Sequence, residues 1–143
     1  MKKMVALLFS AGLFCGVAQA QAPVNWTPDQ LLQPADLATT LAAKKDIPVI
    51  LSVGPGALIP SSTAIGMVKD EEALANLKKQ LSAVPKTTPI VIYCGCCPFE
   101  HCPNVRPAIA LLKQMQFTDY KLLNLPHNLK TDWIDKGYPT TKQ

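Results

Sequence analysis

The chain has 143 residues, a formal net charge of +4 and an apolar fraction of 48%. A chain of this length suits a single domain with its own hydrophobic core. Its basic residues are dispersed and form no run longer than doublets such as Lys44-Lys45 and Lys78-Lys79. Nucleic acids and anionic membranes are bound through basic stripes and patches, so we expect neither as a partner.

Residues 1–20 have the features of a secretory signal in the usual order. Two lysines open the chain, an apolar run follows, and Ala18-Gln19-Ala20 supplies the small-x-small pattern of a signal-peptidase site. The run is shorter than the about 20 apolar residues of a membrane-spanning helix. We therefore expect cleavage after Ala20, which leaves one domain of residues 21–143 in the periplasm or outside the cell, free of the membrane. An uncleaved anchor and a lipid on Cys15 are the weaker alternatives.

The first half of the predicted domain alternates between helix and strand. A helix is predicted over residues 34–45, because this segment opens on proline and repeats leucine at helical spacing. Residues 48–53 form a short β-branched run that is typical of a buried strand. Residues 54–66 are predicted to be a loop, in which the run 61–63 forms ordinary turns. The next helix begins after Asp70, a favoured N-cap that is followed by acidic residues.

The second half repeats this alternation around the cysteines. A second buried strand is predicted over residues 89–93 and ends at the first loop cysteine. After the cysteine-containing loop, a helix is expected from residue 104 or 105 to residue 115, followed by a third strand over residues 120–125. A final helix over residues 128–136 is predicted to end where Gly137 takes a left-handed conformation.

Strands that alternate with helices require crossover connections. Such connections are typical of a parallel sheet, so we predict an α/β fold with helices on both faces of the sheet. Ligands bind such sheets outside the carboxyl ends of the strands. The strand of residues 89–93 has the composition of a central strand, and Cys94 follows it directly. The sequence therefore predicts a functional site at Cys94.

The strongest compositional signal is a group of cysteines in one short segment. Cys94, Cys96, Cys97 and Cys102 all lie within residues 94–102. Exported proteins commonly form disulfides, but bonds within so short a loop constrain little of the unfolded chain. The clustering therefore favours reactivity or ligation, and a loop closed by inert disulfides is the alternative. Four cysteines allow three complete pairings, and the sequence does not choose among them.

Cys94 is our candidate for the nucleophile because it lies where a buried strand ends. The loop and the start of the following helix offer backbone N–H groups that lower a thiol pKa, and the thiolate is the reactive form. We expect Gly95, His101 and Arg106 to contribute to this anion cradle. Gly95 would permit backbone angles that a side chain forbids. His101 would be a base, a ligand or simply solvated, and Arg106 would turn toward the loop.

Beyond the cysteines, short motifs follow one another along the chain in a defined order. They are Val49 to Val53, Leu58-Ile59-Pro60, Tyr93-Cys94 with the helix of residues 105–115, Asp132-Trp133 and Lys136-Gly137-Tyr138-Pro139. In this order they resemble the rhodanese-like (sulfurtransferase) domain over nearly the whole of residues 21–143. The resemblance implies a rhodanese-like fold and a persulfide carried on Cys94. It implies a donor such as thiosulfate and removal of the sulfur by a thiol or cyanide, so a small sulfur donor or acceptor, or a thiol protein, is the expected partner.

The cysteine loop differs from the usual loop of that family. It is longer, contains Glu100, and has no lysine or arginine. It also has three further cysteines. We predict that Cys96, Cys97 and Cys102 are resolving or accessory thiols, which convert a persulfide or sulfenic acid on Cys94 into a disulfide.

Two other classes of function stay open. Thiolates together with an imidazole suit Cu(I) or Zn(II), so the four loop cysteines and His101 form an alternative set of metal ligands. A non-catalytic binding module would keep the fold and use the loop to recognise a partner. No cofactor is expected. A dinucleotide site is rejected in particular, because Gly54-Pro55-Gly56 lacks the third glycine and the immediate helix of a dinucleotide-binding turn.

Overall fold

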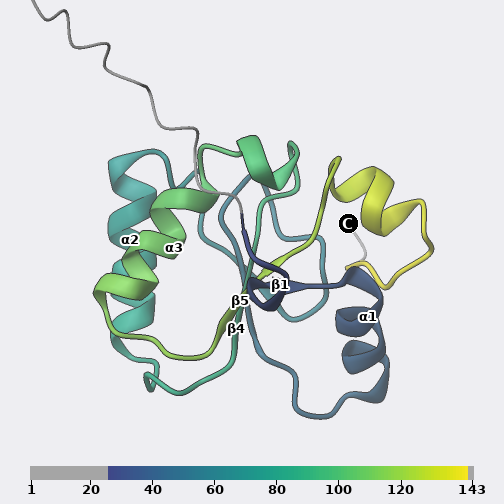
Figure 1. Cartoon of the computed structure of the whole chain (residues 1–143), viewed down its shortest axis with the longest axis horizontal. Helices are drawn as coiled ribbons and strands as arrows, with labels where there is room; N and C mark the ends of the chain where they lie inside the picture. Colours follow the sequence, from purple (N-terminus) through teal and green to yellow (C-terminus); the bar gives the residue numbers. More distant parts are fainter. Residues whose placement is uncertain (1–25, 142–143) are drawn as a thin grey trace, which may run out of the picture.

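The computed structural model describes residues 26–141, and the predicted signal peptide lies outside this range. Five parallel strands form one sheet in the order β1-β5-β4-β2-β3. This arrangement confirms the predicted parallel α/β fold and places β4 at the centre of the sheet (Figure 1). The strands are β1 (Leu31–Leu32), β2 (Val49–Ser52), β3 (Ser62–Ala64), β4 (Ile90–Tyr93) and β5 (Tyr120–Leu123). The helices are α1 (Pro34–Ala43), α2 (Glu71–Ser82) and α3 (Val105–Gln114), with short turns η1 (Pro28–Gln30), η2 (Phe99–His101) and the π-type η3 (Lys130–Ile134).

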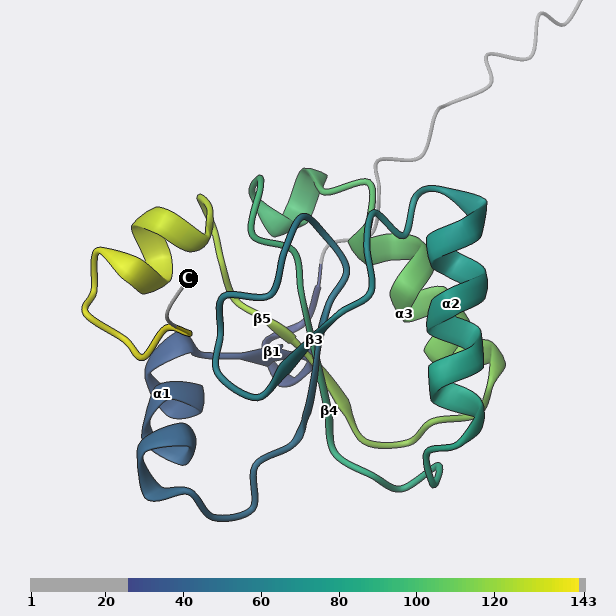
Figure 2. The ribbon, with the colours of Figure 1, turned by 180° about the vertical axis from the view of Figure 1, so that it is seen from behind.

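The sheet separates two hydrophobic clusters, one on each face. Along β4, Ile90 and Ile92 belong to the cluster that includes residues of α2 and α3, whereas Val91 and Tyr93 belong to the cluster that includes residues of α1 and η3. All four side chains are at most 2% exposed, as expected of a strand that is buried on both faces. Figures 1 and 2 show α2 and α3 on one side of the sheet, with α1 and the C-terminal turn on the other.

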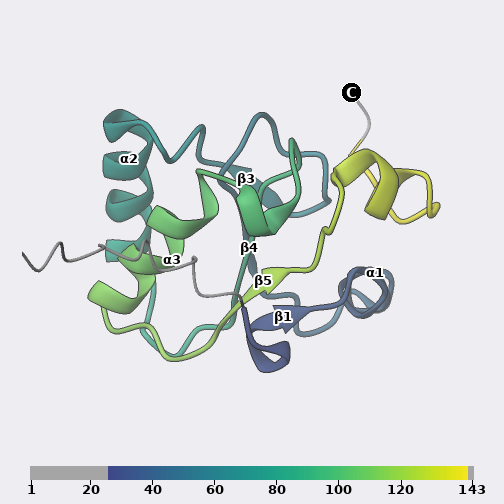
Figure 3. The same cartoon turned by 45° about the horizontal axis from the view of Figure 1, so that its top comes forward.

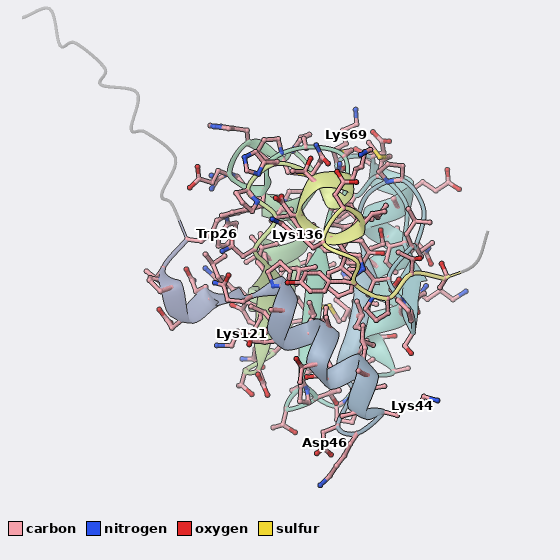
Figure 4. All side chains as sticks on the ribbon, turned by 90° about the vertical axis from the view of Figure 1, so that its right-hand side faces the viewer. Trp26, Lys44, Asp46, Lys69, Lys121 and Lys136 are labelled. Atoms are coloured by element: carbon pink, nitrogen blue, oxygen red, sulfur yellow. The ribbon has the colours of Figure 1, made fainter. Side chains whose placement is uncertain are left out.

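The helices begin where the local sequence predicts. Pro34 occupies the first position of α1, and Asp70 is the N-cap of α2. α1 ends before the predicted residue 45, because Lys44 takes a left-handed conformation with φ of 52°. Figure 4 shows Lys44 and Asp46 at the end of the molecule opposite Lys69. Within residues 26–141 no helix combines the length and apolarity needed to cross a membrane.

Two short strands at the edges of the sheet are absent from the sequence-based prediction. β3 lies inside the segment predicted as a loop, where Ser62 and Thr63 pair with Ile50 and Leu51 of β2 instead of forming ordinary turns. β1 adds two residues beside β5. β3 is polar and largely exposed, and β1 has only two residues, so neither has the extended apolar run by which strands are recognised.

The C-terminal segment contains less helix than predicted and is held by Trp133. The helix expected over residues 128–136 is reduced to η3, while Gly137 has the expected left-handed conformation with φ of 73°. Trp133 is fully buried and donates its Nε1–H to the carbonyl of Pro139 at 2.7 Å. Its ring meets that of Tyr138 edge to face, with the centroids 5.2 Å apart. These contacts fold the end of the chain back onto the α1 side of the sheet.

The loops at the carboxyl ends of the strands gather over one edge of the sheet. Figure 3 brings this edge forward and shows the segment after β4, which contains η2, over the middle of the sheet. β4 is paired with β2 so that Tyr93 lies opposite Ser52, and with β5 so that Ile92 lies opposite Leu122. β4 lies between β2 and β5, so Cys94, the first residue after β4, has the ends of these two strands on either side.

Asp132 organises the start of the C-terminal turn. Its carboxylate accepts hydrogen bonds from the backbone N–H groups of His127 at 2.7 Å and Asn128 at 3.0 Å, and it lies 2.9 Å from Nδ1 of the His127 ring. Burial raises the pKa of Asp132, but these hydrogen bonds outweigh burial and hold the pKa below its ordinary value of 3.8. The ionised side chain therefore stabilises the folded chain.

Asp132→Ala is expected to lower the free energy of unfolding at pH 7 by about 1–3 kcal/mol, since two backbone N–H groups lose a charged acceptor. Because the pKa of Asp132 is lower in the folded than in the unfolded chain, this contribution is present above pH 3.8 and is lost as the pH falls through the folded-state value. Urea unfolding of both proteins at pH 7 and at acid pH measures the difference. The control is Asp135→Ala, which breaks only an exposed ion pair with Lys130. A difference that stays constant down to acid pH would contradict this role.

Candidate functional site

The four cysteines of residues 94–102 come together at the carboxyl end of β4. Their Sγ atoms all lie within 4.8 Å of one another. Cys94 directly follows β4 and Cys102 lies shortly before α3, so regular elements hold both ends of the loop. The structure thus brings together all four thiols that the sequence singles out, at the predicted edge of the sheet.

The thiols form a path from the interior to the surface. Cys94 and Cys102 are buried, with 2% and 1% of their surface exposed, whereas Cys97 is half-buried and Cys96 is exposed. The sulfurs of Cys94 and Cys96 are 3.3 Å apart, and those of Cys96 and Cys97 are 3.4 Å apart. A reagent that reaches Cys96 therefore meets a sulfur in direct contact with the buried Cys94.

Gly54 makes room for the Cys94 side chain. Since Ser52 of β2 lies opposite Tyr93 of β4, the residues that follow the two strands also approach each other. A Cβ atom at Gly54 would lie only 2.5 Å from the Cys94 Sγ. In the sequence Gly54 belongs to a predicted loop and carries no functional signal. Only the register of β2 against β4 identifies its role.

Gly95 has a different role from the one predicted. It has no positive φ, so it is not needed for unusual backbone angles. A Cβ atom at Gly95 would instead lie 2.8 Å from the Cβ of Leu129, whose backbone N–H donates to the Gly95 carbonyl at 3.0 Å. The N–H of Phe99 likewise donates to the carbonyl of Leu125 at 3.2 Å. Close packing against the segment after β5 therefore fixes the cysteine loop.

Cys102 accepts several hydrogen bonds at its sulfur. The Cys94 thiol donates a hydrogen bond to its sulfur, and so do the backbone N–H groups of Asn104 and Val105 at the start of α3 and the Cys97 thiol. These donors outweigh burial and lower the pKa of Cys102 to about 5. The surroundings of Cys102 thus favour its thiolate form.

The surroundings of Cys94 and Cys97 favour their protonated forms. Donation to the Cys102 sulfur, together with burial, raises the pKa of Cys94 well above its ordinary value, against the opposing effect of the Cys96 N–H. Burial, with donation to Cys96 and Cys102, raises the pKa of Cys97 to about 12. The opposite directions of the two pKa shifts have one cause, the hydrogen bond from the Cys94 thiol to the Cys102 sulfur. Transfer of the proton from Cys94 to Cys102 would make Cys94 the thiolate without changing the charge of the buried site.

His101 and Arg106, both predicted to belong to the cradle, lie outside the cluster of sulfurs. His101 is exposed at the end of η2, and its ring is not among the ligand atoms that gather within 4.8 Å. Nη2 of Arg106 donates to the carbonyl of Glu100 at 3.2 Å, and the guanidinium lies 5.7 Å from the centroid of the Trp26 ring. Arg106 thus contacts the loop, as predicted, through the carbonyl of Glu100.

Asn104 is a further residue of the site that has no functional signal in the sequence. It is fully buried, and its Nδ2 lies 3.7 Å from the Sγ of Cys94 and 4.0 Å from that of Cys102. An asparagine just before a helix indicates an N-cap, so local reasoning assigns it that role alone.

Comparison with models of known protein families and with curated proteins finds no match for this chain. The resemblance to the rhodanese-like domain therefore rests on the motifs of the chain itself. A parallel α/β sheet supports many unrelated activities, so the argument for function has to come from the cysteine site.

Titration of the reduced protein, followed by the ultraviolet absorbance of thiolates, is expected to show one group with a midpoint near pH 5. Cys102→Ser should remove this step, because Cys102 receives the N–H groups at the start of α3. Cys97→Ser is the control, which should retain the step with a small upward shift, since Cys97 is a lesser donor to Cys102. Persistence of the acidic step in Cys102→Ser would show that the thiolate lies on another sulfur.

Gly54→Ala is expected to lower the free energy of unfolding by about 1–3 kcal/mol, because the added methyl group overlaps the Cys94 sulfur. A double-mutant cycle isolates this cause. In a Cys94→Ala background the same substitution should cost much less, since the nearest other atoms of residue 94 are 3.5 Å away. Urea unfolding of the four proteins gives the coupling energy. Equal penalties in both backgrounds would mean that Gly54 is required for another reason.

Proposed function

We propose that this protein carries out sulfur transfer, or closely related thiol–disulfide exchange, in an exported location, with Cys94 as the sulfur that reacts first. The observation that carries the proposal is the 3.3 Å contact between the buried Cys94 sulfur and the exposed Cys96 sulfur, within a cluster of four thiols. A sulfur carrier needs a second thiol to which it can pass sulfur, and Cys96 meets that need at the surface.

The first step of the proposed reaction forms a persulfide on Cys94. Its thiolate, produced when the proton passes to Cys102, attacks the outer sulfur of a sulfane donor such as thiosulfate. The S–S bond of the donor breaks, sulfite leaves with the electron pair, and Cys94 retains the additional sulfur. The step consumes no external oxidant or reductant. The backbone N–H of Cys96, which donates to the Cys94 sulfur, would stabilise the anionic product.

Cys96 then provides two routes onward. If its thiolate attacks the outer sulfur of the persulfide, that sulfur moves to the exposed Cys96 and Cys94 returns to a thiolate. An external acceptor thiol can then take the sulfur from Cys96. If the Cys96 thiolate attacks the inner sulfur, a Cys94–Cys96 disulfide forms and hydrosulfide leaves, and a dithiol partner must reduce the disulfide. In both routes Cys97 and Cys102 are accessory thiols.

The charge of the loop bears on the class of donor. Residues 94–103 include Glu100 and Cys102, whose surroundings favour a thiolate, but no lysine or arginine. A small dianion is repelled by such a loop, whereas a neutral polysulfide or a persulfide on a thiol protein is repelled less. We therefore expect a persulfide on a protein thiol, or an uncharged polysulfide, to be a better donor than thiosulfate.

Binding of a soft metal ion is the second candidate function, because the same four sulfurs are close enough to surround one ion. Zn–S bonds of about 2.3 Å in a tetrahedral site separate the sulfurs by about 3.8 Å. All sulfur pairs of the cluster lie within 4.8 Å, so the four cysteines, as thiolates, fit either Zn(II) or Cu(I). The ion and the persulfide would compete for the same atoms.

Mass spectrometry distinguishes the two candidates. After treatment with a polysulfide or with thiosulfate, denatured protein is expected to gain one sulfur atom on Cys94, and Cys94→Ser should lower transfer to an acceptor thiol by about 100-fold or more. Cys97→Ser is the control and should keep most of the transfer. A Cys94→Ser protein that transfers sulfur at the wild-type rate would exclude Cys94 as the carrier. Native protein that gains no sulfur but retains one Cu(I) or Zn(II), lost in Cys96→Ser, would favour the metal site.

A further inference from the structure

Asn104 has the position of a helix cap but does not act as one. It lies directly before α3 and is fully buried. An asparagine at this position normally accepts a hydrogen bond from the second or third N–H group of its helix. The side chain of Asn104 makes no such bond. A buried amide needs partners, so those of Asn104 have to lie elsewhere.

The backbone of Lys69 fixes the orientation of the Asn104 amide. The Lys69 N–H donates to Oδ1 at 3.0 Å, and because only an oxygen can accept this bond, the amide has one orientation. Lys69 belongs to the segment that leads into α2, at the carboxyl end of the sheet (Figure 4). The Nδ2 end then faces sulfur atoms, with Cys94 Sγ at 3.7 Å, Cys102 Sγ at 4.0 Å and Met67 Sδ at 4.0 Å.

Because its neighbours are sulfur atoms, the Asn104 amide donates stronger hydrogen bonds when one of these sulfurs is ionised. Sulfur accepts hydrogen bonds weakly as a thiol or thioether, and bonds to an ionised acceptor are about twice as strong. The N–H groups of Asn104 therefore gain most when Cys94 or Cys102 is a thiolate, or when Cys94 carries an anionic persulfide. A neutral amide can donate a hydrogen bond to either sulfur, whichever is ionised, and its own charge stays the same.

We propose that Asn104 is a hydrogen-bond donor to the reacting sulfurs, which contacts both Cys94 and Cys102 and stabilises a thiolate or a persulfide formed on them. The inference deepens the function proposed above, and its catalytic part rests on that function. Because Oδ1 is held by Lys69, Asn104 also joins the segment before α2 to the thiol cluster. The position of the donor thus depends on a segment that lies 35 residues away in the chain.

Two variants at position 104 remove the donor while keeping a favoured residue before α3, since aspartate and serine are both good N-caps. Asn104→Asp retains an acceptor for the Lys69 N–H but replaces the NH2 group with a carboxylate oxygen. Asn104→Ser removes the amide without adding charge. The matched control is Asn76→Asp, the same substitution on an exposed position of α2, where Nδ2 contacts only the carbonyl of Ile65 among the hydrogen bonds of the described chain.

The first readout is the thiolate absorbance of reduced, metal-free protein, which requires no sulfur donor. The midpoint of the acidic thiol is expected to rise by at least about one pH unit in Asn104→Asp and by less in Asn104→Ser, because the anion loses a donor and in the first case meets a like charge. The rate of persulfide formation should fall by about tenfold or more in Asn104→Asp. Asn76→Asp should leave both quantities unchanged.

Unchanged midpoints in two folded variants, verified by urea unfolding, would overturn the inference. If Asn104→Asp does not fold, the Asn104→Ser protein decides by the same midpoint. Failure of the proposed function gives a different pattern. In that case the wild-type protein gains no sulfur, while the shift of the midpoint still supports Asn104 as a donor to the thiolate cluster.

Discussion

The parallel pairing of β4 with β2 and β5 is the constraint on which the rest of the structure depends. β4 is buried on both faces, and Cys94 is the first residue beyond its carboxyl end. There the pairing continues for one more step, since the N–H of Val53 donates to the carbonyl of Tyr93 at 2.9 Å. This step brings Gly54 against the Cys94 sulfur and so sets the position of the first thiol. The other three thiols follow because the loop is fixed at Gly95 and Phe99 to the segment beyond β5.

A negative charge inside such a site requires donors, because burial of an unpaired anion is costly. Cys102 receives them from thiols and from the N–H groups at the start of α3, with no lysine or arginine in residues 94–103. The site therefore stabilises an anion through hydrogen bonds and without an ion pair from the loop.

The sequence predicts those parts of the structure whose causes are local. Pro34 and Asp70 mark helix starts within a few residues, and the β-branched run of β4 marks a buried strand, so the parallel sheet and the edge that carries Cys94 follow from pattern alone. β3 exists because it pairs with β2, and its own residues carry no strand signal. The role of Gly54 likewise comes from its contact with Cys94, and that of Asn104 from its hydrogen bond with Lys69. Each partner is distant in the chain, so no local pattern reveals either role. Export, sulfur transfer and the role of Cys94 as nucleophile stay predictions that the fold alone does not test.

The packing around Cys94 also decides which part of the protein moves when a sulfur–sulfur bond forms. A disulfide needs its sulfurs about 2.05 Å apart, whereas those of Cys94 and Cys96 are 3.3 Å apart. Gly54 and Asn104 enclose the Cys94 sulfur, so the closing movement of roughly 1 Å has to come from the exposed Cys96. Oxidation would therefore reshape the surface of the loop while the interior stays in place. A partner protein could distinguish the oxidised from the reduced form by that surface alone.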